Sequence, residues 1–190
     1  MRWTVAAALL AATLAAADGY AADSAVVLMY HRFGEDQYPS TNIRLEQFDA
    51  QIAELKSGGY TVLPLPEVIE AVRTGRDLPD KAVAITVDDG YASIHSEAWP
   101  RLKAAGFPFT VFIATDPVDR GLSGFMTWDQ IRELKDAGVT IGAHSRTHLH
   151  MPQSDPERVR SEFAASNARF VAELGRAPTL FAYQIGRAHV

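Results

Sequence analysis

The sequence predicts an α/β domain with a parallel sheet, and three observations favour this class. Short runs of β-branched and aromatic residues alternate with segments in which apolar residues recur at helical spacing. The runs are almost continuously apolar, which is typical of parallel strands that helices cover on both faces. The strand-helix unit recurs regularly along the chain, and this favours a barrel-like closure over an open sheet.

Six apolar runs are predicted to be buried strands. In parallel folds of this kind the catalytic residues lie at the carboxyl ends of the strands, so these ends are where chemistry is expected. The predicted strands are residues 25–31, 60–65, 82–89, 109–114, 139–145 and 179–183.

Three helices are predicted between the strands. The first has apolar residues at i, i+3, i+7 and i+10, from Leu45 to Leu55. Thr127 and Gln130 form a capping-box pattern at the start of the second. The third covers residues 154–174 and has Pro156 near its start, where proline is tolerated.

The composition excludes several classes of function. The 190 residues suit one domain, and 47% hydrophobic with 22% charged residues is ordinary for a globular protein. The net charge of -5 comes with no basic stripe, so nucleic acid is not an expected partner. There is no cysteine, which excludes disulfides and thiolate chemistry and leaves His, Asp and Glu for catalysis. We expect a monomer.

Residues 1–22 are predicted to be a signal peptide. Arg2 supplies the positive charge, a short apolar run follows, and cleavage after Ala17 or Ala21 fits the pattern of small residues. A transmembrane helix is the alternative, but it needs about 20 apolar residues and this run is shorter. We therefore expect export to the periplasm or the extracellular space, no stable membrane span after cleavage, and one domain over residues 23–183.

The third predicted strand ends in Asp88, Asp89 and Gly90. Two adjacent carboxylates after a buried run are costly to hold together unless a cation or a proton relieves them. A plain Asp-Gly turn with both carboxylates in water is the alternative. Because successive side chains point in different directions, one Asp could bind a metal while the other faces substrate.

The fifth predicted strand ends in the segment HSRTH, with His144 and His148 four residues apart. On a helical turn or in a tight loop this spacing lets two imidazoles converge on one ion, although such pairs are also common at surfaces and in cores. Combined with an Asp from the other strand end, two imidazoles and one carboxylate form a facial set that leaves positions open for water and substrate.

Three motifs resemble those of the polysaccharide deacetylases, the family also known as carbohydrate esterase family 4 or the NodB-homology domain. The segment TVDDG (residues 86–90) resembles Thr-Phe-Asp-Asp-Gly, with Val87 in place of the usual Phe. HSRTH resembles the His-Ser/Thr-x-x-His motif, and FAY (residues 181–183) resembles the start of a Phe-x-Tyr-Pro-x-Gly motif. The likeness covers residues 26–183, and separate motifs in the right order make it specific.

This resemblance implies a distorted (β/α) barrel, incomplete at its carboxyl end, that hydrolyses N-acetyl and sometimes O-acetyl groups of polysaccharides. Carried over residue by residue, Asp89, His144 and His148 would hold a divalent metal, usually zinc. Asp88 would be the general base that deprotonates a metal-activated water. A catalytically inactive glycan-binding domain is the alternative, although a binder would not need a base beside a metal triad.

The expected substrate is a polymer that contains N-acetylglucosamine. Poly-N-acetylglucosamine is favoured by the resemblance, and peptidoglycan and chitin-like chains stay open. His31 and Tyr183 are the candidate substrate-binding residues, although His31 could equally be structural. Tyr91 and Trp128 could stack on sugar rings or pack into the core. A Ser-dependent esterase is discounted because no Gly-x-Ser-x-Gly segment is present.

The last seven residues, 184–190, do not continue the third motif, because Gln184 and Ile185 stand where the family has Pro and Tyr. The codons CAG ATC GGA AGA GCA CAC GTC would encode this tail and contain a common short-read sequencing adapter. We therefore predict that the tail is not native and that the domain is truncated near Tyr183. Different codons in the nucleotide record would refute this hypothesis.

Overall fold

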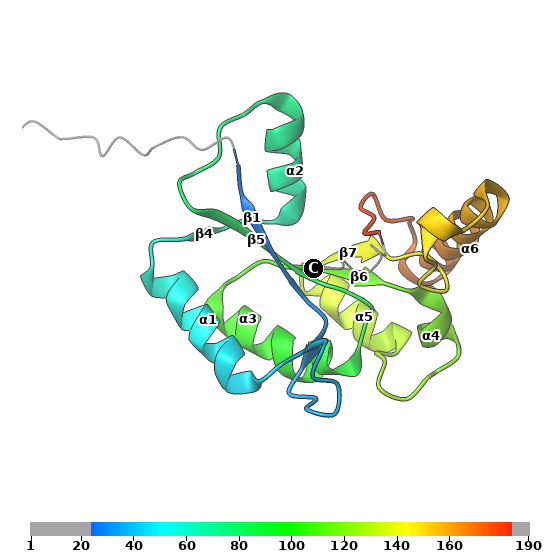
Figure 1. Cartoon of the computed structure of the whole chain (residues 1–190), viewed down its shortest axis with the longest axis horizontal. Coiled ribbons are helices and arrows are strands. Elements are labelled where there is room, and N and C mark those ends of the chain that lie inside the picture. Colours follow the sequence, from blue (N-terminus) through cyan, green and yellow to red (C-terminus); the bar gives the residue numbers. More distant parts are fainter. Residues whose placement is uncertain (1–23, 184–190) are drawn as a thin grey trace, which may run out of the picture.

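Strand β5 (Ala82–Val87) lies at the centre of the fold, and every one of its residues is buried. The computed structural model describes residues 24–183, and Figure 1 shows the arrangement of their elements. The predicted signal peptide and the predicted non-native tail lie outside the described residues. The expected domain bounds of residues 23 and 183 stay a prediction.

All strands that pair with β5, directly or through a neighbour, run parallel to it. β1 (Val26–Tyr30) pairs along one side of β5 in the register Val26 to Val83 through Tyr30 to Val87. On the other side, β4 (Thr61–Val62) pairs with the start of β5 and β6 (Thr110–Ile113) with its end. β7 (Thr140–Ala143) pairs with β6 and completes a five-stranded sheet. The predicted parallel α/β class is confirmed. The predicted burial of the strand over residues 25–31 is wrong, because β1 lies at an edge of the sheet and leaves Val26, Val27 and Met29 47–62% exposed.

Two smaller features complete the strands. β2 (Arg32–Phe33) and β3 (Asn42–Ile43) form a separate two-stranded sheet just after β1. The predicted last strand, residues 179–183, forms only an isolated parallel bridge between Phe181 and Ala143. Within residues 24–183 the sheet is open, because β1 and the Phe181 bridge lie at opposite edges and do not pair with each other.

Helices follow the strands, and three of them match the sequence prediction. Thr127 and Gln130 make the predicted capping box, and Asp155 caps the long last helix by accepting the N–H of Arg158. The helices are α1 (Leu45–Ser57), α2 (Leu65–Thr74), the π-helical turn η1 (Ile94–Ala98), α3 (Trp99–Ala105), α4 (Thr115–Asp119), α5 (Trp128–Asp136), the 3-10 turn η2 (Met151–Gln153) and α6 (Pro156–Leu174).

The predicted strand over residues 60–65 is wrong in its second half. Only Thr61 and Val62 pair as a strand, and α2 begins at Leu65. Pro64 and Pro66 explain the difference, because proline lacks the N–H that a strand ladder needs but fits the first turn of a helix. The apolar run was therefore a short strand joined directly to a helix.

The two faces of the sheet bury different side chains. Val83, Ile85 and Val87 of β5 pack against α1, α3 and α5, which Figure 1 shows on one side of the sheet. Ala82 and Ala84 face the other way and pack against α2. The small side chains of Ala82 and Ala84 let α2 approach this second face closely. The first face, which α1, α3 and α5 cover, carries most of the core.

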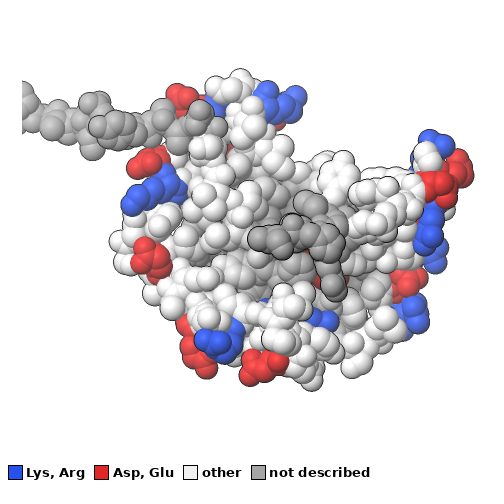
Figure 2. All heavy atoms as spheres, in the orientation of Figure 1, with Lys and Arg blue, Asp and Glu red and all other residues white. Residues whose placement is uncertain are grey.

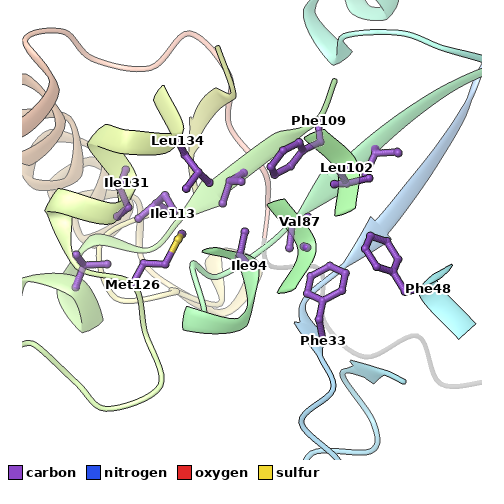
Figure 3. Packing of buried hydrophobic residues seen from close by; sticks show 14 of the residues in the cluster. Phe33, Phe48, Val87, Ile94, Leu102, Phe109, Ile113, Met126, Ile131 and Leu134 are labelled. Atoms are coloured by element: carbon purple, nitrogen blue, oxygen red, sulfur yellow. The ribbon is translucent and has the colours of Figure 1, made fainter. Parts of the chain in front are cut away.

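The main core continues into the segment that precedes the first helix. Figure 3 shows Phe33 and Phe48 side by side next to Val87. The rings of Phe33 and Phe48 are 4.7 Å apart between centroids and tilted by 59°, a favourable aromatic arrangement. This packing anchors β2 and α1 against the end of β5 that carries Asp88 and Asp89.

Gly142 in β7 gives a stability prediction. A Cβ at this position would lie 2.4 Å from Cδ1 of Phe112 on the neighbouring strand. We expect Gly142→Ala to lower the free energy of unfolding by about 1–3 kcal/mol through overpacking, measured by urea denaturation. Adding Phe112→Val should recover part of this loss, since it removes the clashing Cδ1 and Cε1 atoms. A Gly142→Ala protein as stable as the parent would contradict the packing described.

The surface carries charges of both signs. On the face in Figure 2, acidic and basic side chains are interspersed around the rim, and no single-sign area dominates it. Among residues 24–183, no helix combines the length and the apolar character needed to cross a membrane. The expected absence of a nucleic-acid partner stays a prediction.

Candidate metal centre

The predicted acidic and histidine motifs follow two strands that flank β6. β5 ends at Val87 and is followed by Asp88 and Asp89, and β7 ends at Ala143 and is followed by His144. Both strands pair with β6 in the same direction, so their carboxyl ends meet at one edge of the sheet. The structure therefore brings the two strand ends together at this edge, and their role as a shared site stays a prediction.

Three side chains converge there. Oδ1 of Asp89 lies 3.1 Å from Nε2 of His148 and 3.4 Å from Nε2 of His144, and the three atoms lie within 4.8 Å of one another. All three atoms are buried and have no hydrogen-bond partner among the described residues. Buried acceptors without a hydrogen-bond partner cost free energy, so the convergence of these three atoms favours the binding of a cation. Two imidazoles and a carboxylate suit Zn²⁺ and leave one position open.

The backbone around the site is held in unusual conformations. Four non-glycine residues of the described chain have positive φ, and three of them are Asp89 (76°), Ser145 (62°) and His148 (60°). Such conformations cost free energy and cluster at functional sites. Gly90, at φ 89°, continues the turn after Asp89, and a Cβ there would lie 3.0 Å from Cδ1 of Ile113. Gly90 therefore lets the chain turn sharply directly after the two carboxylates.

His144 is oriented by the last described segment of the chain. Its Nδ1 lies 2.9 Å from the backbone carbonyl oxygen of Ala182, which can only accept a hydrogen bond. Nδ1 must therefore carry the proton, and Nε2 presents its lone pair to the site. The same segment is tied to β7, because Ala143 donates to the carbonyl of Leu180 and accepts from the N–H of Ala182. This geometry sets the imidazole as a metal ligand requires.

The pKa values of the two adjacent carboxyl groups, Asp88 and Asp89, are shifted in opposite directions. Burial raises the pKa of Asp88 above its ordinary value, although His144 and His31 nearby oppose this effect. Burial would also raise the pKa of Asp89, but the imidazoles of His144 and His148 outweigh it and hold that pKa far below its usual range. Asp89 is thus the permanent anion of the pair, while Asp88 is the better proton acceptor.

The carboxylates of Asp88 and Asp89 also shift the pKa of His144. Burial alone would lower its pKa, but Asp89 and Asp88 raise it above the ordinary value. A cation that binds to Nε2 therefore competes with a proton for this nitrogen.

The two predicted substrate-binding residues lie at opposite edges of the sheet. His31 follows β1, near enough to Asp88 to affect its pKa, and lines a cavity of about 280 Å³ together with the segment 40–43. Tyr183 is 67% exposed and packs edge-on against Phe181, with ring centroids 5.3 Å apart. Their contact with substrate stays a prediction.

The two aromatic residues left open in the sequence have separate positions. Trp128 packs edge-on against Phe170 in the core and donates its indole N–H to Asp119. The core interpretation therefore holds for Trp128. Tyr91 lies beside Asp89, and the guanidinium of Arg32 stacks on its ring at 3.4 Å from the centroid.

Sequence reasoning missed two carboxylates that brace the loops of the site. Glu35 accepts a hydrogen bond from Ser93 and another from Arg32, which ties the segment after β1 to the segment after β5. Glu162 of α6 accepts from the loop that carries the two histidines. The signal for Glu162 is its place on the buried stripe Glu162, Ser166 and Phe170 at i, i+4 and i+8.

The fold and the site together define a parallel α/β protein with a candidate divalent-metal centre at the carboxyl edge of its sheet. A family model described as polysaccharide deacetylase matches residues 75–189. The chain belongs to the polysaccharide deacetylase family, as its motifs indicated.

Curated relatives carry related names. The chain is 29% identical over 161 residues to a putative polysaccharide deacetylase, YxkH, of Bacillus subtilis, covering 85% of this chain and 56% of the relative. It is 31% identical over 120 residues to the poly-beta-1,6-N-acetyl-D-glucosamine N-deacetylase of Escherichia coli K12, covering 55% and 18%. The Staphylococcus aureus MRSA252 protein of the same name is 29% identical over 174 residues, covering 83% and 59%. The chain thus spans less than two thirds of each relative.

Solved structures share the fold. IcaB from Ammonifex degensii is 31% identical and superposes with a TM-score of 0.74 over 88% of this chain and 77% of that one. The Streptococcus pyogenes deacetylase PplD, solved in complex with acetate, superposes with a TM-score of 0.77 over 90% of this chain and 76% of that one. At 24% identity the PplD likeness is evidence for the fold alone.

Proposed function

We propose that this protein is an exported, metal-dependent deacetylase that hydrolyses N-acetyl groups of a polymer of N-acetylglucosamine. The observation that carries the proposal is the convergence of Asp89, His144 and His148 beside Asp88 at the carboxyl edge of the sheet. Family membership supports a hydrolase acting on acetylated carbohydrate.

Asp89, His144 and His148 would hold the metal, and zinc suits this donor set best. A divalent cation bound there would polarise the acetyl carbonyl and lower the pKa of a water molecule. The protein's own contribution is to present three donor atoms in advance, with the tautomer of His144 fixed by the carbonyl of Ala182.

Asp88 would be the general base. Its carboxylate is buried next to Asp89, and burial raises its pKa, which makes it a stronger proton acceptor than an exposed Asp. Asp88 would take the proton from the attacking water while Asp89 stays bound to the cation. The two neighbouring carboxylates would thus divide the roles that their different surroundings support.

The proposed substrate is poly-N-acetylglucosamine, because relatives from Escherichia coli and Staphylococcus aureus are named for that polymer. His31 and Tyr183 would contact the sugar chain from the two edges of the sheet. Export would follow from the signal-peptide pattern of residues 1–22, with release into the periplasm or outside the cell. The mature protein is proposed to act as a monomer.

Acetate release tests the proposal. The purified full-length gene product, loaded with zinc, should release acetate from a β-1,6-linked oligomer of N-acetylglucosamine and stop after chelation. A β-1,4-linked oligomer and an O-acetylated sugar serve as controls for linkage and bond type. Binding of the oligomer without acetate release, in protein shown to contain zinc, would contradict the proposal and favour a glycan-binding domain.

A further inference from the structure

Glu162 is a buried carboxylate on α6, and its hydrogen bonds with the described residues all go to one loop, the segment of residues 144–148 that carries both histidines. It is 8% exposed. Its Oε2 accepts the backbone N–H of Arg146 at 2.9 Å and of Thr147 at 2.7 Å, and its Oε1 accepts the Thr147 hydroxyl at 2.8 Å. Since ionised acceptors make stronger hydrogen bonds than neutral ones, these three contacts are strong ones.

The loop needs outside partners because of its shape. Ser145 and His148 both have positive φ, so the turn between them cannot pair its N–H groups as a helix would. On the other side of the loop, the carbonyls of Ser145 and Arg146 accept the N–H groups of Thr115 and Asp116 at 3.4 and 2.9 Å. The loop is thus held by its carbonyls at the start of α4 and by its N–H groups at Glu162.

We infer that Glu162 is a positioning residue for the metal centre. By fixing the backbone of residues 145–148, it keeps Nε2 of His144 and Nε2 of His148 directed at Oδ1 of Asp89. Both of its oxygens are occupied by the loop, and it does not belong to the group of converging donor atoms, so it acts through the loop and not as a ligand. The inference rests on the metal centre proposed above.

The hydrogen-bond pattern allows a sharp comparison of two substitutions. In Glu162→Gln the amide oxygen can accept both backbone N–H groups, and the amide NH₂ can donate to the Thr147 hydroxyl, which also accepts. In Glu162→Leu all three hydrogen bonds are lost at similar volume. A role through charge alone would make both variants equally harmful, whereas positioning by hydrogen bonds spares the Gln variant.

The test is the zinc dissociation constant of the full chain, measured by competition with a chelating dye and without substrate. We expect Glu162→Leu to bind zinc about 10- to 100-fold more weakly than the parent. Glu162→Gln should stay within about threefold, since only the charge assistance is lost. Glu157→Leu is the matched control, because Glu157 lies on the same helix, is 84% exposed and pairs with Arg160.

Each outcome separates the two proposals. A parent protein that binds no zinc would refute the proposed metal centre itself. A folded Glu162→Leu protein with the parent's zinc dissociation constant would overturn only the role of Glu162. Equal losses in the Gln and Leu variants would also overturn positioning by hydrogen bonds. If the Leu variant does not fold, Thr147→Val decides: it removes one of the three bonds and should weaken zinc binding, and an unchanged dissociation constant overturns the inference.

Discussion

Replacing Asp88 by Asn is expected to lower kcat for acetate release by about 10²- to 10⁴-fold while zinc still binds. Asn has nearly the shape of Asp but cannot take a proton from water. Asp88 is buried beside the converging donor atoms without belonging to them, so the metal centre should survive the change. The measurement pairs steady-state acetate release with the zinc content of the purified variant.

Asp136→Asn is the matched control for this prediction. It makes the same chemical change on α5, where Asp136 is exposed and pairs with Lys135. The control should keep the parent's kcat and zinc content. Full activity in the Asp88→Asn protein would show that another group is the base.

Loss of a metal ligand should weaken zinc binding itself, in contrast to the loss of the base at Asp88. Asp89→Asn and His148→Asn are each expected to weaken zinc binding by more than the roughly 10- to 100-fold associated with partners outside the ligand set. Asn is the informative replacement at both positions, because Asp89 and His148 have positive φ and Asn tolerates that conformation better than Ala. The variants thus remove a ligand with the least disturbance of the backbone.

The control is His95→Asn, since His95 pairs with Glu133 at 2.7 Å outside the metal centre. Zinc affinity should be unchanged in this variant, and acetate release should follow zinc content in all three proteins. Parent-like zinc affinity in both the Asp89 and the His148 variants would refute the ligand set.

The sequence predicted the class of fold because the two central strands, β5 and β6, are buried along their whole length. Residues 82–87 form an apolar run that only Thr86 interrupts, and the structure buries all of them. The predicted strand over residues 60–65 was too long, because the two-residue strand β4 is followed by the proline-capped helix α2 without a break in hydrophobicity. Helix α2 shows its own spacing in Leu65, Val68 and Ala71, which pattern alone could have found.

The candidate ligands were predictable for a topological reason. Parallel strands present their carboxyl ends at one edge of the sheet. Because β5 and β7 are both neighbours of β6, Asp89 after β5 and the histidines after β7 lie near each other at that edge. The sequence could not show that Ser145 and His148 adopt positive φ, because both residues adopt it only where tertiary contacts hold them. Glu162 holds the backbone between these two residues, and the carbonyl of Ala182 holds the neighbouring imidazole of His144, both from distant parts of the chain.

The position of zinc in crystals of the zinc-loaded protein, located by anomalous diffraction, tests the metal centre directly. We expect one ion, with Oδ1 of Asp89 and Nε2 of His144 and His148 at about 2.0–2.2 Å from it. An ion bound elsewhere, or a zinc-loaded crystal in which these three atoms remain without a metal, would contradict it.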